Sequence, residues 1–172
     1  MFKSLTLLIL SFCTVPTCSS ADFVKYNHKP LQERVGIAPY ARVLDEKEIK
    51  CLADNIYFEA GNQKEIGMKA VAFATLNRLK HDNFPDTICK IVYQKISQVC
   101  QFSWTCKKRK KIDDYYTYYR SKRMAKLMLV NYNYIYDVTK GATFFHRNDI
   151  MPQWANSKKR TAIIGRHLFY TL

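Results

Sequence analysis

Glu59 is the residue whose type and position most strongly suggest chemistry. It stands in the stretch NIYFEAGNQ, residues 55–63, in line with Ile49, Leu52 and Ile56. At about 100° per residue, Glu59 lies within roughly 80° of all three apolar side chains on a helix. A carboxyl group in apolar surroundings keeps its proton to higher pH, and it can then protonate a leaving oxygen. We therefore predict that Glu59 is a general acid and base; the alternative is a helix-end Glu that faces solvent.

Three short segments combine aromatic rings with hydrogen-bonding side chains, which are the features that bind sugars. Pyranose rings stack on aromatic faces, and their hydroxyl groups need polar partners. The segments QFSW, FFH and PQWA, with a histidine near the C-terminus, supply the candidate glycan-contacting residues: Gln101, Phe102, Ser103, Trp104, Phe145, His146, Trp154 and His167. Aromatic residues of a small domain are also ordinary core residues, so both interpretations stay open.

Motifs of other catalytic classes are missing from the sequence. It contains no HExxH zinc motif, no GxSxG elbow, no Walker loop and no GxGxxG fingerprint. His146 and His167 could hold a metal together with Asp149, but hydrogen-bonded strand histidines are the commoner case. We therefore expect no metal ion and no cofactor.

The first 21 residues have the composition of a secretory signal peptide. An early lysine precedes an apolar run from Leu5 to Val15, and small residues follow at 19–21. The run is too short for an ordinary membrane-spanning helix. We predict a signal peptide at residues 1–21 and an exported protein of the periplasm, cell wall or extracellular space. A retained N-terminal anchor is the alternative.

Export bears on both the cysteines and the charge. Loss of residues 1–21 leaves 27 Lys and Arg against 14 Asp and Glu, a net charge of +13 that fits a polyanionic wall polymer. An even number of cysteines remains, which predicts disulfides between Cys51, Cys89, Cys100 and Cys106. Four cysteines allow three pairings; we take Cys89 with Cys100, and Cys51 with Cys106, as the working assignment.

Local signals predict a helix around Glu59. Asp45 followed by Glu48 has the form of a capping box at a helix start. The run AGN at 60–62 predicts its end, with Gly61 or Asn62 in the left-handed cap conformation.

Further elements follow along the chain. Apolar spacing predicts helices at 64–79 and 121–136, the first with alanines that permit close packing against the Glu59 helix. Residues 84–94 combine a proline turn with a short β-prone run, and CQFSWTC is too short for a helix. Residues 142–146 and 161–170 are predicted strands, with a bend at Gly165. The fold class is therefore α+β, with helices first and a small antiparallel sheet after them.

Six ordered blocks resemble a known family. They are CLADNIYFEAGNQKEIGMKAVAFATLNRL, FPDTICKIVYQ, CQFSWTC, TKGATFFH, MPQWA and IGRHLFY, from about Cys51 to Tyr170. Together they resemble the SleB-type cell wall hydrolases, which are spore-cortex-lytic and related peptidoglycan-cleaving enzymes. The resemblance implies a single lysozyme-like and lytic-transglycosylase-like domain at 45–172, after an irregular lead-in at 22–44. It also implies that Glu59 is the catalytic acid.

The chain departs from the family pattern beside that acid. Relatives typically have Glu-Ala-Arg-Gly-Glu where this chain has EAGNQ, so Gly61 replaces the Arg and Gln63 the second Glu. A hydrolase needs two carboxyl groups, whereas a lytic transglycosylase can use one. With one acid retained, the expectation is a monomeric lytic transglycosylase that acts on peptidoglycan glycan strands, with no nucleic-acid partner and no membrane span once the signal is removed. Glu65, Asp82 and Asp149 remain possible second acids.

Three alternatives remain open at this point. The first is a hydrolytic muramidase, and the second is a non-catalytic cationic wall-binding protein, suggested by the lost Arg and Glu. The third is a secreted basic ribonuclease, suggested by the charge, the disulfides and the pair His146 and His167.

Overall fold

The computed structural model of the chain describes residues 45–107 and 111–172. The predicted signal peptide at 1–21 and the lead-in at 22–44 therefore lie outside the described residues. Within the described ranges, none of the helices is both long enough and apolar enough to cross a membrane.

The helix predicted around Glu59 is α2, Glu46–Ala60, and its start is confirmed. Asp45 is its N-cap and accepts a hydrogen bond from the backbone N–H of Lys47. The reciprocal half of the capping box is wrong, because Glu48 accepts backbone N–H bonds from Ile88 and Cys89 instead. These donors lie far along the chain, so a local pattern could not reveal them.

The left-handed cap predicted at the end of α2 is also wrong. Gly61 keeps helical angles, with φ −58° and ψ −32°, and Asn62 does not have a positive φ either. A Cβ on Gly61 would lie 2.5 Å from the backbone carbonyl oxygen of Tyr57 and 2.8 Å from the methyl group of Thr117. Glycine is therefore needed here because of these close contacts rather than for a positive φ.

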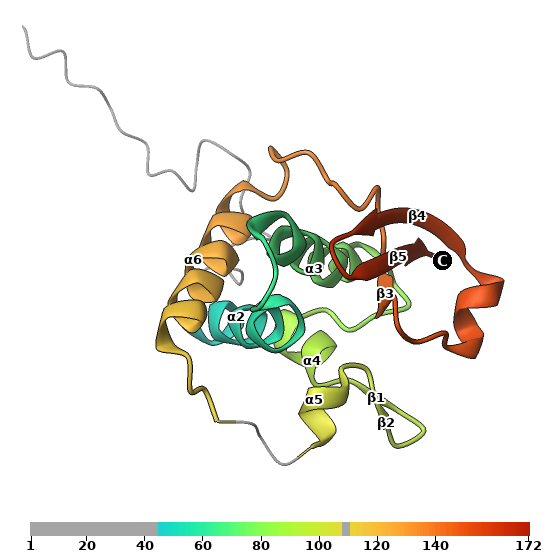
Figure 1. Cartoon of the computed structure of the whole chain (residues 1–172), viewed down its shortest axis with the longest axis horizontal. Coiled ribbons are helices and arrows are strands. Elements are labelled where there is room, and N and C mark those ends of the chain that lie inside the picture. The colour runs from blue at the N-terminus through green and yellow to red at the C-terminus, as the bar shows by residue number, and fades with distance from the viewer. Residues whose placement is uncertain (1–44, 108–110) are drawn as a thin grey trace, which may run out of the picture.

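Two more helices pack against α2. Helix α3, Glu65–Asn77, continues into the 3₁₀ turn η2, Arg78–Lys80, which confirms the prediction at 64–79. Helix α6, Tyr115–Asn131, begins earlier than the predicted 121–136, because Asp114 caps it through the backbone N–H of Thr117, and it also ends earlier. Figure 1 shows α6 along one side of the α2–α3 pair and the sheet on the other side.

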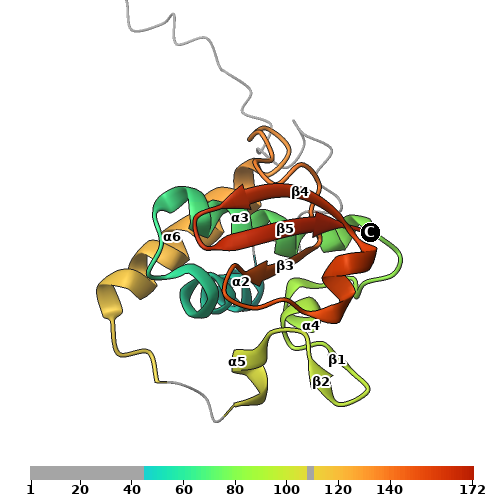
Figure 2. The same ribbon diagram turned by 45° about the vertical axis from the view of Figure 1, so that its right-hand side comes forward.

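The C-terminal strands form one antiparallel sheet in the order β3–β5–β4. Strand β3 is Phe144–Arg147, β4 is Lys159–Ile164 and β5 is His167–Thr171, with the 3₁₀ turn η3, Gln153–Ser157, before β4. The predicted strand at 161–170 is thus a hairpin, and Gly165, at φ 58°, lies in its turn. In Figure 2 this sheet lies across the face of α3.

The apolar core has two parts, one between the helices and one under the sheet. The larger part gathers side chains of α2, α3 and α6, including Leu52, Ile56 and Phe73. The smaller part joins Ala70 and Ala74 of α3 to Phe169 of β5 and to Ala142. The small residues of α3 therefore allow close approach of the sheet, and not only of α2 as predicted.

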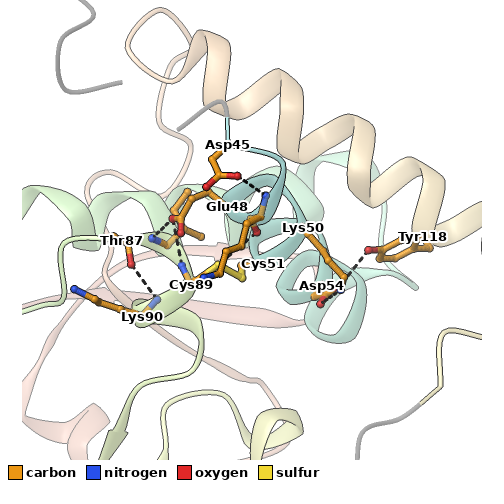
Figure 3. Close-up of a disulfide and its surroundings, with 11 residues drawn as sticks. Asp45, Glu48, Lys50, Cys51, Asp54, Thr87, Cys89, Lys90 and Tyr118 are labelled. Atoms are coloured by element: carbon orange, nitrogen blue, oxygen red, sulfur yellow. Dashed lines mark hydrogen bonds and ion pairs between the residues drawn. A yellow bond between two sulfur atoms is a disulfide. The ribbon is translucent and has the colours of Figure 1, made fainter. Parts of the chain in front are cut away.

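The two disulfides do not follow the working assignment. Cys51 pairs with Cys89, and Cys100 pairs with Cys106, so all four cysteines are bonded as expected but the pairing was wrong. The first bond joins α2 to the short helix α4, Ile88–Val92, beside the Glu48 hydrogen bonds (Figure 3). Helix α4 replaces the β-prone run predicted within 84–94, because Thr87 caps its N-terminus through the backbone N–H of Lys90.

The second disulfide closes a compact unit at the lower edge of the fold in Figure 1. It joins the end of a two-stranded hairpin, β1 Lys95–Ile96 and β2 Val99–Cys100, to the end of α5, Ser103–Cys106. CQFSWTC thus contains one helical turn, contrary to the expectation from its length.

Candidate active site

A cleft of about 720 Å³ opens at the C-terminal end of α2. Its lining comes from four parts of the chain: the end of α2 and the loop after it, α5, the start of α6, and the edge of the sheet with its β4–β5 turn. Glu59 and His167 both line this cleft. Residues far apart in sequence therefore meet at the carboxylate singled out from the sequence.

Glu59 lies half-buried in the cleft, in the last turn of α2. Burial raises the pKa of its carboxyl group from 4.5 to about 7, although the positive charges of Arg147 and Arg78 act in the opposite direction. In the described part of the chain, no hydrogen bond or ion pair engages this carboxylate. Glu59 therefore has the properties of a group that holds a proton near neutral pH and can release it.

Arg78 is a fully buried cation that interacts electrostatically with Glu59. Its Nε donates a 2.7 Å hydrogen bond to the backbone carbonyl of Thr143, and its guanidinium lies over the rings of Phe84, Phe102 and Phe144. Burial lowers its pKa to about 9, so it remains charged at neutral pH. Arg78 is the largest fully buried side chain of the described residues, and the sequence analysis missed it.

One wall of the cleft is an aromatic pair that belongs partly to the core. Trp104 of α5 is 8% exposed and stacks on Phe58 of α2, with 4.5 Å between the ring centroids. Its indole N–H donates a 3.1 Å hydrogen bond to the side-chain carbonyl of Asn55, which is fully buried. The Trp104 ring is thus held on both sides, and only its margin is left to line the cleft.

Gln63 connects the loop after α2 to the sheet edge. Its side-chain N–H donates to Nδ1 of His167 at 2.9 Å, and its carbonyl accepts the backbone N–H of Arg166 at 3.2 Å. His167 is 1% exposed, and burial together with Arg147 and Arg166 lowers its pKa to about 4. The imidazole is therefore neutral at physiological pH.

Only some of the sequence-based candidates line the cleft. Ser103, Trp104 and His167 do so alongside Glu59, whereas the rest lie outside the lining: Gln101, Phe102, Phe145, His146 and Trp154. Phe102 and Phe145 pack in or against the helical core instead. Proximity in sequence to a cleft residue is thus a poor guide, because the tertiary packing of each segment decides which of its side chains reach the cleft.

His146 serves the structure of the sheet. Its Nδ1–H donates to the backbone carbonyl of Arg147 at 2.8 Å, and its Nε2 accepts from the hydroxyl of Tyr170 at 2.9 Å. Its ring also stacks on Tyr170 and meets Trp154 edge-on. Both ring nitrogens are engaged, which leaves neither for a metal. Among the described residues, no group of three or more His, Cys, Asp or Glu side chains is arranged to hold a metal ion.

The possible second acids also change in the light of the structure. None of the three candidates taken from the sequence lines the cleft: Glu65, Asp82 and Asp149. Two aspartates that the sequence analysis missed do line it. Asp114 is occupied as the N-cap of α6, and Asp113 accepts a hydrogen bond from the Tyr57 hydroxyl at 2.9 Å.

Four cations share the lining with these acids, and no local motif identified them: Lys107, Lys111, Arg147 and Arg166. Arg147 forms an ion pair with Asp149, which lies just beyond the lining. Lys107 and Lys111 belong to the basic run CKKRKK, residues 106–111, of which residues 108–110 are outside the described ranges.

Solved structures of other proteins share the fold of this chain. The catalytic domain of the germination-specific lytic transglycosylase SleB from Bacillus anthracis superposes with a TM-score of 0.59 at 22% identity, covering 73% of this chain and 95% of that domain. The catalytic domain of the Bacillus cereus SleB protein superposes with a TM-score of 0.57 at 22% identity, covering 72% and 89%. The predicted α+β, lytic-transglycosylase-like fold is thereby confirmed.

Sequence comparison extends the likeness to a family. The chain is 28% identical over 125 residues to the spore cortex-lytic enzyme of Halalkalibacterium halodurans, covering 72% of this chain. The match covers 34% of that enzyme, so the chain spans about a third of its length. The profile of the cell wall hydrolase family matches residues 62–170, beginning just beyond Glu59. Since this match covers more than half of the chain, the protein belongs to the cell wall hydrolase family.

Proposed function

We propose that the protein is a peptidoglycan-cleaving glycosidase, specifically a lytic transglycosylase that cuts between N-acetylmuramic acid and N-acetylglucosamine. The observation that carries the proposal is the state of Glu59. It is a half-buried carboxyl group in a 720 Å³ cleft, with a pKa of about 7 and no hydrogen-bond partner among the described residues. Family membership supports the substrate class.

The reaction needs one group that gives and then takes a proton. Protonated Glu59 donates its proton to the glycosidic oxygen, and the bond to the muramic acid C1 breaks. The resulting carboxylate then removes the proton of the C6 hydroxyl, whose oxygen attacks C1 and closes a 1,6-anhydro ring. No water is consumed, and Glu59 ends in its starting state. A pKa near 7 suits both halves of this cycle at neutral pH.

Other residues of the lining suit a polar, anionic polymer. Ser103 and His167 offer hydrogen bonds to sugar oxygens, and the margin of Trp104 offers an apolar edge for a ring. The four cations of the lining attract the carboxylates that peptidoglycan carries. This complementarity favours glycan strands as the partner, with the predicted export leading the protein to the cell wall.

Asp113 supports one alternative, a hydrolytic muramidase. It lies in the same cleft as Glu59, is exposed, and has the Tyr57 hydroxyl as a hydrogen-bond donor. A second carboxylate across the scissile bond could activate water or form a glycosyl intermediate. We favour the transglycosylase because its reaction needs only Glu59, and one oxygen of Asp113 already accepts the hydrogen bond of the Tyr57 hydroxyl.

Digestion of purified sacculi separates these reactions. Mass spectrometry of the released muropeptides detects 1,6-anhydro ends for a transglycosylase and reducing ends, one water heavier, for a hydrolase. We expect anhydro ends from the wild type and from Asp113→Asn. Reducing ends that disappear in Asp113→Asn would establish the hydrolase instead. Binding to sacculi without release would reduce the protein to a wall-binding module, and RNA breakdown alone would reassign it as a nuclease.

A further inference from the structure

Gln63 occupies a site built to hold its amide in one place. Its carbonyl oxygen lies where a Cβ on Gly165 would clash, and a Cβ on Gly67 would come within 2.7 Å of the same atom. The amide therefore fits between the β4–β5 turn and the first turn of α3 only because both neighbours are glycines. The side chain joins two segments that are about a hundred residues apart in sequence.

The two hydrogen bonds of Gln63 determine which way its amide faces. The backbone N–H of Arg166 is a donor and nothing else, so it must meet the carbonyl oxygen of Gln63. The NH₂ group then faces Nδ1 of His167, at 2.9 Å. The orientation of the amide therefore follows from the chemistry of the backbone group.

The amide in turn determines the tautomer of His167. An NH₂ group donates only, so Nδ1 must accept, and in a neutral imidazole the proton then resides on Nε2. Within the described residues, Nε2 has no hydrogen-bond partner, and the ring lines the cleft that contains Glu59. His167 is thus a neutral hydrogen-bond donor, and its Nε2–H has no acceptor among the described residues.

We propose that Gln63 is a positioning residue that holds His167 in the Nε2–H form, so that the ring donates a hydrogen bond to an acetamido or hydroxyl oxygen of the bound glycan. The inference rests on the proposed function for the identity of the acceptor. The orientation of the ring stands on contacts within this chain.

The charges around His167 favour the same neutral state. Arg147 of β3, Arg166 of the turn and His146 of β3 all disfavour an imidazolium, and only Asp149 acts in the opposite direction. Glu59 of α2 faces the same cleft. Protonation of Nδ1 would also set two donors against each other at the Gln63 contact. The side chain at 63 therefore decides whether the ring presents a donor, an acceptor or a charge.

The substitution Gln63→Glu reverses the polarity of this pair. A carboxylate accepts from the Arg166 N–H and also from an Nδ1–H of His167, so a neutral ring would present a bare Nε2 to the cleft, and an imidazolium would be stabilised. The matched control is Gln153→Glu, which makes the same change in charge at an exposed position of η3.

Nitrogen-15 NMR of the His167 ring tests the tautomer without any activity assay. We expect a pyrrole-type Nε2 and a pyridine-type Nδ1 in the wild type and in Gln153→Glu, with the pattern reversed or averaged to imidazolium in Gln63→Glu. A wild-type ring protonated on Nδ1 would overturn the inference even if sacculi are digested normally. Failure of the wild type to cleave sacculi would instead count against the proposed function.

The pH profile tests the consequence for turnover. At alkaline pH, where the Gln63→Glu ring is neutral and lacks the Nε2 proton, we expect its kcat/KM to fall about tenfold below that of Gln153→Glu, the value of one hydrogen bond. At acidic pH the imidazolium restores the donor, and the ratio should recover. A ratio that does not change with pH would mean that Gln63 only joins the loop to the sheet, and it would overturn the proposal. Thermal melts of both variants check that each one is folded.

Discussion

The two ends of α2 each carry a glutamate, and the two carboxylates lie in different surroundings. Glu48, near the N-terminal end, accepts the backbone N–H groups of Ile88 and Cys89 at 2.6 and 3.3 Å, beside the Cys51–Cys89 disulfide (Figure 3). Glu59, at the C-terminal end, lies half-buried at a cleft without such donors among the described residues. One carboxylate anchors α4 to α2, and the other is left with a raised pKa.

The contrast shows that burial alone does not determine the surroundings of a carboxylate. Glu48 has two backbone donors, whereas Glu59 has none among the described residues, and burial raises the pKa of Glu59. The Glu59 end of α2 therefore tolerates a poorly solvated carboxyl group, and the packed, disulfide-linked opposite end supports the helix that carries it.

The largest effect is expected from Glu59→Gln. It keeps the size of the side chain but removes the transferable proton, so release of anhydro-muropeptides should fall at least 10²–10⁴-fold, the usual contribution of general acid–base catalysis. Mass spectrometry of digested sacculi measures the loss, and circular dichroism should show an unchanged fold.

Glu48→Gln is the matched control on the same helix. It makes the same chemical change where the carboxylate binds backbone donors, so it should leave turnover intact and lower the free energy of unfolding by about 1 kcal/mol. If Glu48→Gln loses activity and Glu59→Gln retains it, the assignment of roles to the two ends is reversed.

The two disulfides should also differ in how much each contributes to the free energy of unfolding. Cys51–Cys89 spans 38 residues and Cys100–Cys106 spans 6. By loop entropy, replacing both cysteines of the first pair with serine should cost about 4 kcal/mol of unfolding free energy, and replacing the second pair about 2 kcal/mol.

Urea denaturation of the two double variants measures this difference. The second pair closes the unit that carries Ser103 and Trp104, so its loss should reduce turnover more than its smaller stability cost suggests. Equal stability losses in the two double variants, or unchanged turnover without the second bond, would contradict this prediction.

The last prediction concerns how stability depends on pH. The pKa of Glu59 is about 7 in the folded protein against 4.5 unfolded, so the stability that its protonated form contributes is full below pH 4.5 and is lost as pH rises toward 7. Glu59→Gln cannot titrate. As pH rises from 4.5 to 7, the unfolding free energy of the wild type should therefore fall by up to about 3 kcal/mol relative to that of Glu59→Gln.

Unfolding free energies of both proteins at pH 4.5 and pH 8 test this. Wild-type turnover should also decline above pH 7, as the general acid loses its proton. A constant stability difference across this range would show that Glu59 is solvated and ionised like an ordinary surface carboxylate.

Features that depend on neighbouring residues could be predicted from the amino-acid sequence. The Asp45 cap, the helices around Glu59 and at 64–79, the turn at Gly165 and the place of Glu59 on an apolar helix face all follow from spacing within a few residues. Local backbone geometry produces these features, and they need no distant partner. The ordered blocks also carried the family resemblance.

Contacts between residues that are distant in sequence could not be predicted in this way. The cysteine pairing, the α4 donors for Glu48, the core position of Phe102 and the presence of Asp113 in the cleft depend on chain segments that periodicity does not relate. Gln63 illustrates the limit best. In the sequence it is a lost carboxylate, whereas in the fold it is a donor to Nδ1 of His167, because the β4–β5 turn brings that ring and the Arg166 N–H to opposite ends of one amide.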